Sequence, residues 1–115
     1  MNEFHVATDF SPYLGGRYRD DGEFSGEEFR DEHLLVLVEN AIQSGRTIKI
    51  DFDGVLGMPT SFLEEAFGGM MRARPQWALS EVERAMKIEA PRSPRLKPFI
   101  ELATQFLKRA SKSRG

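Results

Sequence analysis

The sequence predicts a layered α/β domain in which helices pack on a mixed sheet of about four strands. Strand-like and helix-like segments alternate along most of the chain. This order favours parallel neighbouring strands joined by right-handed helical crossovers. The chain has 115 residues and is 40% hydrophobic, which is enough for one buried core. We therefore expect a single domain over residues 1–110, followed by a disordered basic tail over residues 111–115.

Three short segments have the composition of strands. Thr47–Phe52 (TIKIDF) is rich in β-branched residues and should form the central, most buried strand. Glu3–Phe10 alternates loosely between apolar and polar residues, and Met86–Glu89 (MKIE) matches a last strand. Arg17–Phe24 follows a glycine-rich turn and fits either a further strand or a structured loop.

The first predicted helix has clear signals at both ends. It should span Ser25–Ser44, because Ser25 and Glu28 have the spacing of a capping box. Gly45 follows the last helical residue and can adopt the left-handed conformation that ends many helices. Between these signals, apolar residues recur at helical spacing.

Two further long helices, and a short one, follow from the same kind of pattern. The second helix should span Thr60–Arg72, with Thr60 or Ser61 as its capping residue. The last helix is expected over Ser93–Ala110, with a proline in its first turn. A short helix over Gln76–Arg84 lies between them.

The sequence lacks the signatures of common enzymes. It has no cysteine, no glycine-rich phosphate-binding motif and no metalloprotease or serine-hydrolase motif. The two histidines, His5 and His33, are 28 residues apart and do not form a local pair of metal ligands. We therefore expect a protein that is not an enzyme and that needs neither a metal nor a cofactor.

The formal net charge of −2 hides opposite charges in the two parts of the chain. Residues 1–66 hold 14 acidic and 5 basic side chains, whereas residues 67–115 hold 4 acidic and 11 basic ones. A basic region can indicate nucleic-acid binding, but a pI near 5.7 and the scarcity of aromatic residues in positions expected to be exposed do not favour an RNA-binding sheet here. We interpret the basic end, Lys108–Gly115, as a solvated tail and expect no nucleic-acid partner.

No segment has the properties of a membrane span or a secretion signal. The longest apolar run, Leu34–Val38, is far shorter than the ~20 residues that cross a bilayer. Met1–Asp9 has two acidic residues and neither lysine nor arginine, unlike the basic start of a signal peptide. We expect a cytoplasmic protein without membrane contact.

Four charged residues form a candidate site for a small anionic ligand or a nucleotide. Arg17 and Arg19 lie in a glycine-flanked segment and could clamp a phosphate or carboxylate, or could instead pair with nearby acidic residues and brace the loop. Asp51 and Asp53 follow a buried strand, where they could hold Mg²⁺ together with substrate phosphates. They could equally accept amide hydrogens in the turn at Gly54.

The segment Gly57–Glu65 joins a buried strand to a helix and places two hydroxyls, those of Thr60 and Ser61, at the helix start. Free amides and the helix dipole favour an oxygen or a phosphate there. A phosphoryl group would add a charge of about −1.5 to −2, enough to change an interface. Capping and phosphorylation are both compatible with this spacing.

The segment Thr47–Met70 (TIKIDFDGVLGMPTSFLEEAFGGM) resembles the core motif of STAS domains, the fold of bacterial anti-sigma-factor antagonists. Together with Gly15–Gly26 (GGRYRDDGEFSG), it resembles more closely the bacterial STAS-like domain family of unknown function. The resemblance implies a STAS-like single domain.

Several positions carry the resemblance to STAS antagonists. Asp51, Gly54 and Val55 match the strand end and the Gly-Val pair that follows it. Thr60-Ser61 fall where the antagonists have two serines, one of which a partner kinase phosphorylates. Pro59 and Phe62 stand where the antagonists have an aspartate and a glycine.

The resemblance implies a signalling or regulatory module that binds a histidine-kinase-like ATPase domain or another protein partner. Phosphorylation of Ser61 or Thr60 would switch that binding. The candidate residues for partner binding and phosphorylation are Gly57, Met58, Pro59, Thr60, Ser61, Glu64 and Glu65. The alternative is a sensor of a small anion or nucleotide that binds through Arg17, Arg19 and the start of the second helix, with Asp51 and Asp53 as further candidate ligand-binding residues. The oligomeric state stays open.

Overall fold

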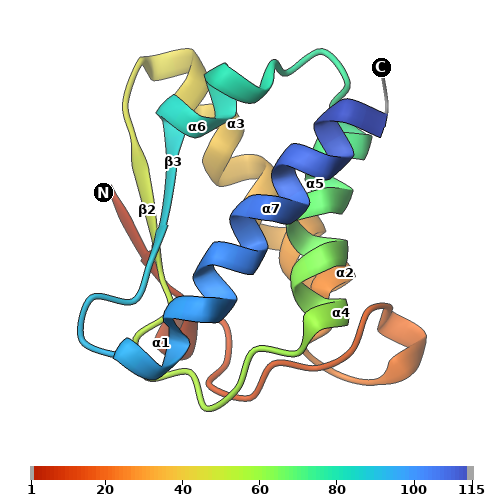
Figure 1. The fold of residues 1–115 in the computed structure, drawn as a ribbon, viewed down its shortest axis with the longest axis vertical. Coiled ribbons are helices and arrows are strands. Elements are labelled where there is room, and N and C mark those ends of the chain that lie inside the picture. The colour runs from red at the N-terminus through yellow and green to blue at the C-terminus, as the bar shows by residue number, and fades with distance from the viewer. Residues whose placement is uncertain (1, 114–115) are drawn as a thin grey trace.

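The structure is a computed structural model that describes residues 2–113 and contains a three-stranded sheet (Figure 1). The strands β1 (Glu3–His5), β2 (Ile48–Asp51) and β3 (Met86–Glu89) are parallel, and β2 lies between the other two. Ile48 and Ile50 are both buried. The prediction of a central, buried strand in this region is therefore confirmed.

The expected mixed sheet of about four strands is wrong in both strand number and strand direction. Residues 17–24 form a loop with a short 3₁₀ turn, η1 (Arg19–Asp21), and not a further strand. The Asp21 carboxylate accepts the backbone N–H of Tyr18 at 2.9 Å, and Phe24 has a left-handed backbone with a φ of 57°. Local bonds between side chain and backbone thus replace a strand ladder in this loop.

The first strand is also shorter than its sequence pattern suggests. It ends at His5, and the helix α1 (Val6–Asp9) follows directly. A carboxylate oxygen of Asp9 accepts the backbone N–H of His5 at 2.9 Å, which favours a helical turn here over a continued strand.

Two long helices each consist of three successive segments, of which the middle one is a π-helix. The first is made of α2 (Gly26–Phe29), η2 (Arg30–Leu34) and α3 (Leu35–Ser44), and the second of α4 (Thr60–Leu63), η3 (Glu64–Gly68) and α5 (Gly69–Ala73). The remaining helices are α6 (Leu79–Ala85), the 3₁₀ turn η4 (Pro94–Leu96) and α7 (Lys97–Ser113). These bounds agree with the predicted helices to within a few residues.

The two ends of the first long helix follow the sequence signals. The Ser25 side chain accepts the backbone N–H of Glu28 at 3.1 Å, and Gly45 has the left-handed φ of 72°. The end of α7 differs from expectation, because the helix continues to Ser113. Residues 111–113 are therefore helical, and residues 114–115 of the predicted tail lie outside the described residues.

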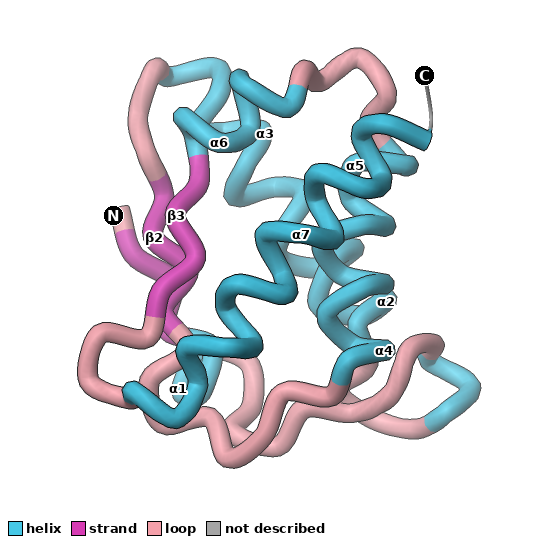
Figure 2. Tube along the Cα trace, in the orientation of Figure 1, coloured by secondary structure: helices cyan, strands magenta, loops and turns pink. Residues whose placement is uncertain are grey.

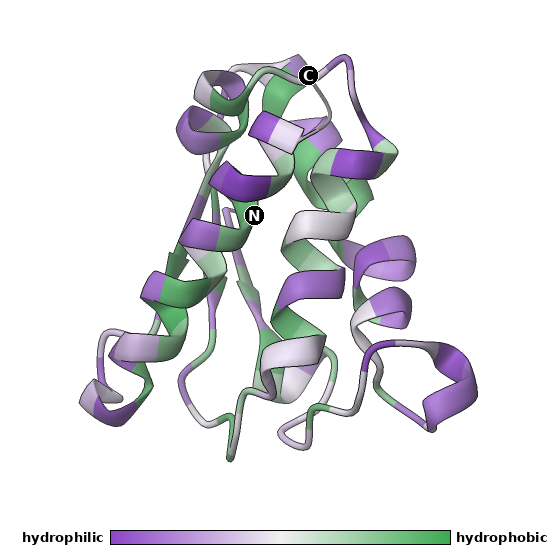
Figure 3. Cartoon of the chain, turned by 45° about the vertical axis from the view of Figure 1, so that its right-hand side comes forward, coloured by the Kyte–Doolittle hydropathy of each residue, from purple (hydrophilic) through white to green (hydrophobic). Residues whose placement is uncertain are grey.

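The long helices pack together on one side of the sheet (Figures 1 and 2). In α7 the hydrophobic and hydrophilic residues lie on different sides of the helix (Figure 3), whereas most residues of the second long helix are buried. Between the layers, four phenylalanines are fully buried: Phe29, Phe52, Phe62 and Phe67. On the opposite face of the sheet, Lys49 and Lys87 are exposed.

The first helix approaches the second closely at Gly26. A Cβ atom at this position would lie 2.5 Å from the carbonyl oxygen of Phe62. Gly26→Ala should therefore lower the free energy of unfolding by about 1–3 kcal/mol, measured by urea denaturation. Gly57→Ala is the matched control, because nothing lies within 4 Å of its Cβ, and it should change stability by less than about 1 kcal/mol. Equal stability of the two variants would contradict the close helix contact.

Candidate functional site

Two loops lie side by side where β2 ends and form a corner beside the start of α4. The backbone N–H of Leu56 donates to the carbonyl of Pro12 at 3.0 Å, and Tyr13 and Gly57 form a parallel bridge. Arg95 adds a third support, because its guanidinium donates to the carbonyl of Val55 at 2.7 Å. We call residues 11–14 and 55–61 the loop corner.

The loop corner exposes large apolar side chains. Tyr13 is 66% exposed and Leu56 is 59% exposed. A shallow hollow of about 470 Å³ lies beside them and is lined by Tyr13, Leu14, Leu56, Gly57, Met58 and Pro59. Most large apolar residues of the domain are buried, so this pair stands out on the surface.

The two hydroxyls at the start of α4 do not cap it, so the predicted capping role is wrong. Pro59 occupies the N-cap position, and no side-chain hydrogen bond caps the helix. A capping side chain belongs to the last non-helical residue, whereas Thr60 is already the first helical one. Thr60 is exposed and Ser61 is half-buried, which leaves the Thr60 side chain open to solvent.

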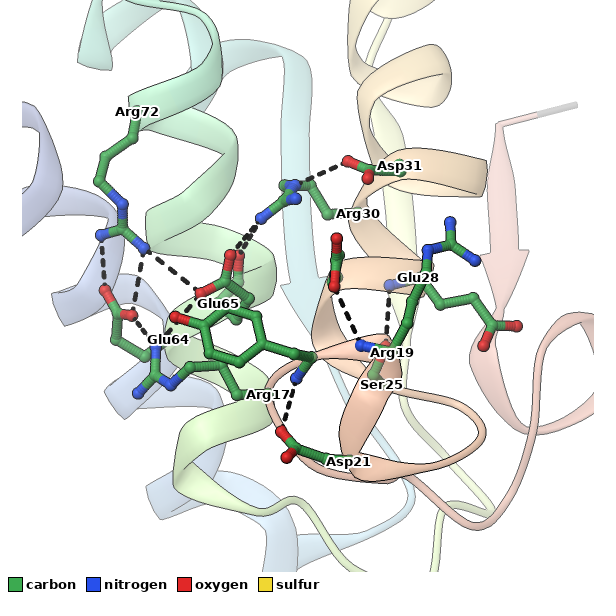
Figure 4. A network of polar contacts seen from close by, with 12 residues as sticks. Arg17, Arg19, Asp21, Ser25, Glu28, Arg30, Asp31, Glu64, Glu65 and Arg72 are labelled. Carbon is green, nitrogen blue, oxygen red and sulfur yellow. Dashed lines mark hydrogen bonds and ion pairs between the residues drawn. The ribbon is translucent and has the colours of Figure 1, made fainter.

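Glu64 and Glu65 lie one turn further along this helix and bind three arginines (Figure 4). Arg17 Nη1 lies 2.5 Å from an oxygen of Glu64 and 3.3 Å from an oxygen of Glu65. Arg72 donates to Glu64 at 2.7 Å, and Arg30 forms an ion pair with Glu65. We call these five residues the ion-pair network. It joins the loop 17–24, the first helix and the second helix.

The network shifts the titration of its members. The pKa of the Glu64 carboxyl lies below its ordinary value, chiefly because it accepts hydrogen bonds from Arg72. Partial burial acts in the opposite direction, and Arg17 adds to the lowering. The hydrogen bond to Glu64 in turn raises the pKa of Arg17. Glu64 therefore stays ionised over the whole physiological range.

Arg17 and Arg19 brace a loop in this structure. Arg17 is held by the ion-pair network, and Arg19 lies 2.9 Å from a carboxylate oxygen of Glu32. The backbone N–H of Arg19 also donates to Glu27 at 2.9 Å. Both guanidinium groups thus have carboxylate partners within the chain.

Asp51 and Asp53 have separate structural partners. Asp51 accepts the backbone N–H of Asp53 at 2.8 Å and lies 3.2 Å from His5 Nδ1. Asp53 accepts the Ser93 hydroxyl at 2.8 Å and the backbone N–H of Arg92 at 3.0 Å. The bonds of Asp53 hold the connection between β3 and α7 against the end of β2. No recorded bond joins either aspartate to Arg17 or Arg19, so the four residues do not form one polar cluster.

Sequence reasoning missed the residues that give the loop corner its character. Tyr13 and Leu56 are single apolar residues in loops, and only the fold brings them together. Arg30 and Arg72 lie on helices without any local signal for their shared acidic partners. The one available hint was the acidic pair Glu64-Glu65 between apolar stretches of the helix.

The comparisons with known proteins identify the family. The family described as STAS-like domain of unknown function (DUF4325) matches residues 25–90, which is more than half of the chain. The chain belongs to this family. The matched region of this STAS-like domain contains Gly57–Glu65, whereas Arg17 and α7 lie outside it. No curated protein and no solved structure shows a significant match.

Within residues 2–113 of this STAS-like domain, every helix is too short or too polar to span a membrane. The same residues contain no group of three or more histidine, aspartate or glutamate side chains arranged to hold a metal ion.

Removing the Glu64 charge should make stability less dependent on pH. A folded-state pKa below the unfolded value stabilises the protein above the unfolded pKa of about 4.3, and this contribution disappears as pH falls through the folded value. Glu64→Gln should cost about 1–2 kcal/mol at pH 7, and the difference from wild type should shrink below about pH 3. Chemical denaturation at the two pH values measures both numbers.

Glu32→Gln serves as the control for this prediction. It removes the partner of Arg19, but both of those side chains are about half exposed, so the cost should stay below about 1 kcal/mol. A Glu64→Gln variant that loses no more stability at pH 7 than Glu32→Gln would show that the network does not stabilise the domain.

Proposed function

We propose that this STAS-like domain is a non-catalytic, cytoplasmic signalling module that binds a protein partner through the loop corner. The partner class that the STAS resemblance favours is a histidine-kinase-like ATPase domain. The observation that carries the proposal is the exposed pair Tyr13 and Leu56 beside the hollow at Gly57–Pro59.

The chemistry of the loop corner suits a protein interface. Interfaces are rich in tyrosine and arginine at their centres, and charged groups other than arginine are rare there. The loop corner offers Tyr13 and Leu56, and the exposed Arg95 donates to the backbone carbonyls beside them. Its backbone is held by the bonds from Leu56 and Arg95, so little order would have to be gained on binding.

Phosphorylation at the start of α4 would regulate this interface. Of the two hydroxyls, that of Thr60 is the more exposed, which favours Thr60 over Ser61 as the residue a kinase reaches. A phosphoryl group there would add about −1.5 to −2 charge directly after Pro59, which lines the hollow beside the apolar pair. A charge buried without a partner at the centre of an interface weakens binding strongly.

The alternative, a small-anion sensor built on Arg17, Arg19, Asp51 and Asp53, has less support. Each arginine already forms an ion pair with a glutamate of the chain. Each aspartate already accepts backbone or hydroxyl hydrogens. A ligand at these residues would first have to displace those partners.

Binding to an ATPase-domain partner tests the proposal. The partner is the ATPase domain encoded by a gene next to that of this protein. Where no such gene is present, the partner is an ATPase domain identified by affinity purification with the full chain. Leu56→Ser should weaken binding by about tenfold or more in calorimetry, since truncating an apolar anchor costs ~1.4 kcal/mol or more. Val36→Ser is the matched control, because Val36 is an equally exposed apolar residue on α3.

Thr60→Asp in the same titration tests whether phosphorylation at Thr60 regulates the interface. This variant should bind the partner more weakly than wild type, while its free energy of unfolding stays within about 1 kcal/mol of the wild-type value. Unchanged affinity in Leu56→Ser, or equal loss in Val36→Ser, would remove the loop corner as the partner site.

A further inference from the structure

The outer face of the sheet has an unusual charge arrangement. Parallel sheets are generally covered on both faces, but Glu3, Lys49 and Lys87 are exposed on the face opposite the long helices. These three residues form one row, because Glu3 pairs in register with Lys49, and Lys49 pairs with Lys87. Two lysines directly opposite each other repel, which destabilises the pair of strands.

The row formed by Glu3, Lys49 and Lys87 borders a hollow of about 650 Å³. Its lining consists of Asn2, Glu3, Arg46, Thr47, Lys49 and Lys87, so three cations face a single carboxylate. The Glu3 carboxylate lies 3.5 Å from His5 Nε2. Among residues 2–113, no ion pair is recorded for any of the three cations.

A fourth cation is fixed close to this hollow. The guanidinium of Arg84 donates to the carbonyl of Arg46 at 3.0 Å. The Thr47 hydroxyl donates to the carbonyl of Arg84 at 3.0 Å. These two bonds tie the start of β2 to the segment before β3, and they hold the basic residues of both connections together.

We propose that this hollow binds the phosphate groups of a small phosphorylated anion, with a diphosphate group as the recognised unit. Phosphate oxygens would accept hydrogen bonds from the Arg46 guanidinium and the two ammonium groups, which have no anionic partner within residues 2–113. Such an anion would also relieve the repulsion between Lys49 and Lys87. The hollow has the volume of a small-ligand site.

A neighbouring hollow offers room for the rest of a larger ligand. It measures about 520 Å³ and shares Asn2, Arg46 and Thr47 with the first. Away from the shared residues, its polar lining is neutral and includes Asn40, Gln43 and Ser44. A nucleotide could place its phosphates in the cationic hollow and its neutral part in this one, whereas free diphosphate would fill the first hollow alone.

Calorimetric titration of the full chain with inorganic pyrophosphate and with ATP at low salt tests this site. The double variant Lys49→Gln/Lys87→Gln should bind both ligands at least about tenfold more weakly than the wild type. Lys97→Gln/Lys108→Gln is the control, because it removes two exposed lysines of α7 and changes the net charge equally. It should bind within about twofold of wild type.

The ratio of the two affinities distinguishes the sources of the anion. Tighter binding of ATP indicates a nucleotide, equal affinities indicate the diphosphate group alone, and both results support the site. Absence of binding by either ligand, or equal weakening in both double variants, would overturn it. Binding of a single-stranded oligonucleotide in place of both small ligands would also overturn it.

This site is independent of the loop corner, since its lining shares no residue with it. Leu56→Ser should therefore leave pyrophosphate affinity unchanged.

Discussion

The pairing of Glu64 and Glu65 with three arginines is the interaction on which the arrangement of the two long helices and the loop 17–24 depends. Glu65 is only 8% exposed, and a carboxylate this buried is stable only when it is paired and hydrogen-bonded. Its partners come from both long helices and, through Arg17, from the loop 17–24. The ion-pair network therefore holds together three segments that no strand ladder connects.

Both long helices change locally where the network forms. Arg30 begins the π-helical segment η2, and Glu64 begins η3, and π-helical turns in proteins often accompany functional sites. The glycine pair of the second helix makes room for the charged groups. A Cβ on Gly68 would lie 2.5 Å from Glu64 Oε2, and one on Gly69 would lie 2.6 Å from Arg30 Nη1. Each glycine within a helix lowers its stability by about 1 kcal/mol relative to alanine. Here the two glycines leave the space that the side chains of Glu64 and Arg30 occupy.

The elements with strong local signals were predicted well from the sequence. The strand Met86–Glu89 has the predicted bounds, and the Ser25 cap forms as its spacing indicates. In the loop 17–24, by contrast, local acceptors such as Asp21 decide the conformation. Thr60 or Ser61 was expected as the N-cap of the second helix, but Pro59 occupies that position. The sequence pattern alone does not show whether the helix begins directly after Pro59 or one or two residues later.

The candidate site was predicted only in part for a related reason. Gly57–Glu65 was proposed from the sequence because it is continuous and lies within the STAS-like motif Thr47–Met70. Tyr13 and Arg17 join it through contacts across more than 40 positions of the chain, which a single sequence cannot show. The partners of Arg17 were expected to be the acidic residues close to it, and they lie instead on the second helix.

Backbone hydrogen exchange of Arg17→Ala, compared with Arg19→Ala, tests most directly whether the ion-pair network holds the loop 17–24 against the second helix. Arg17 bridges both glutamates of the second helix, whereas the Arg19 guanidinium pairs with Glu32 on the first helix. In Arg17→Ala, the amides of residues 17–24 and of the first turn of α4 should exchange about tenfold faster or more, while those of β2 and β3 keep their rates. Unchanged exchange in both regions, or the same acceleration in Arg19→Ala, would contradict the central role of this network.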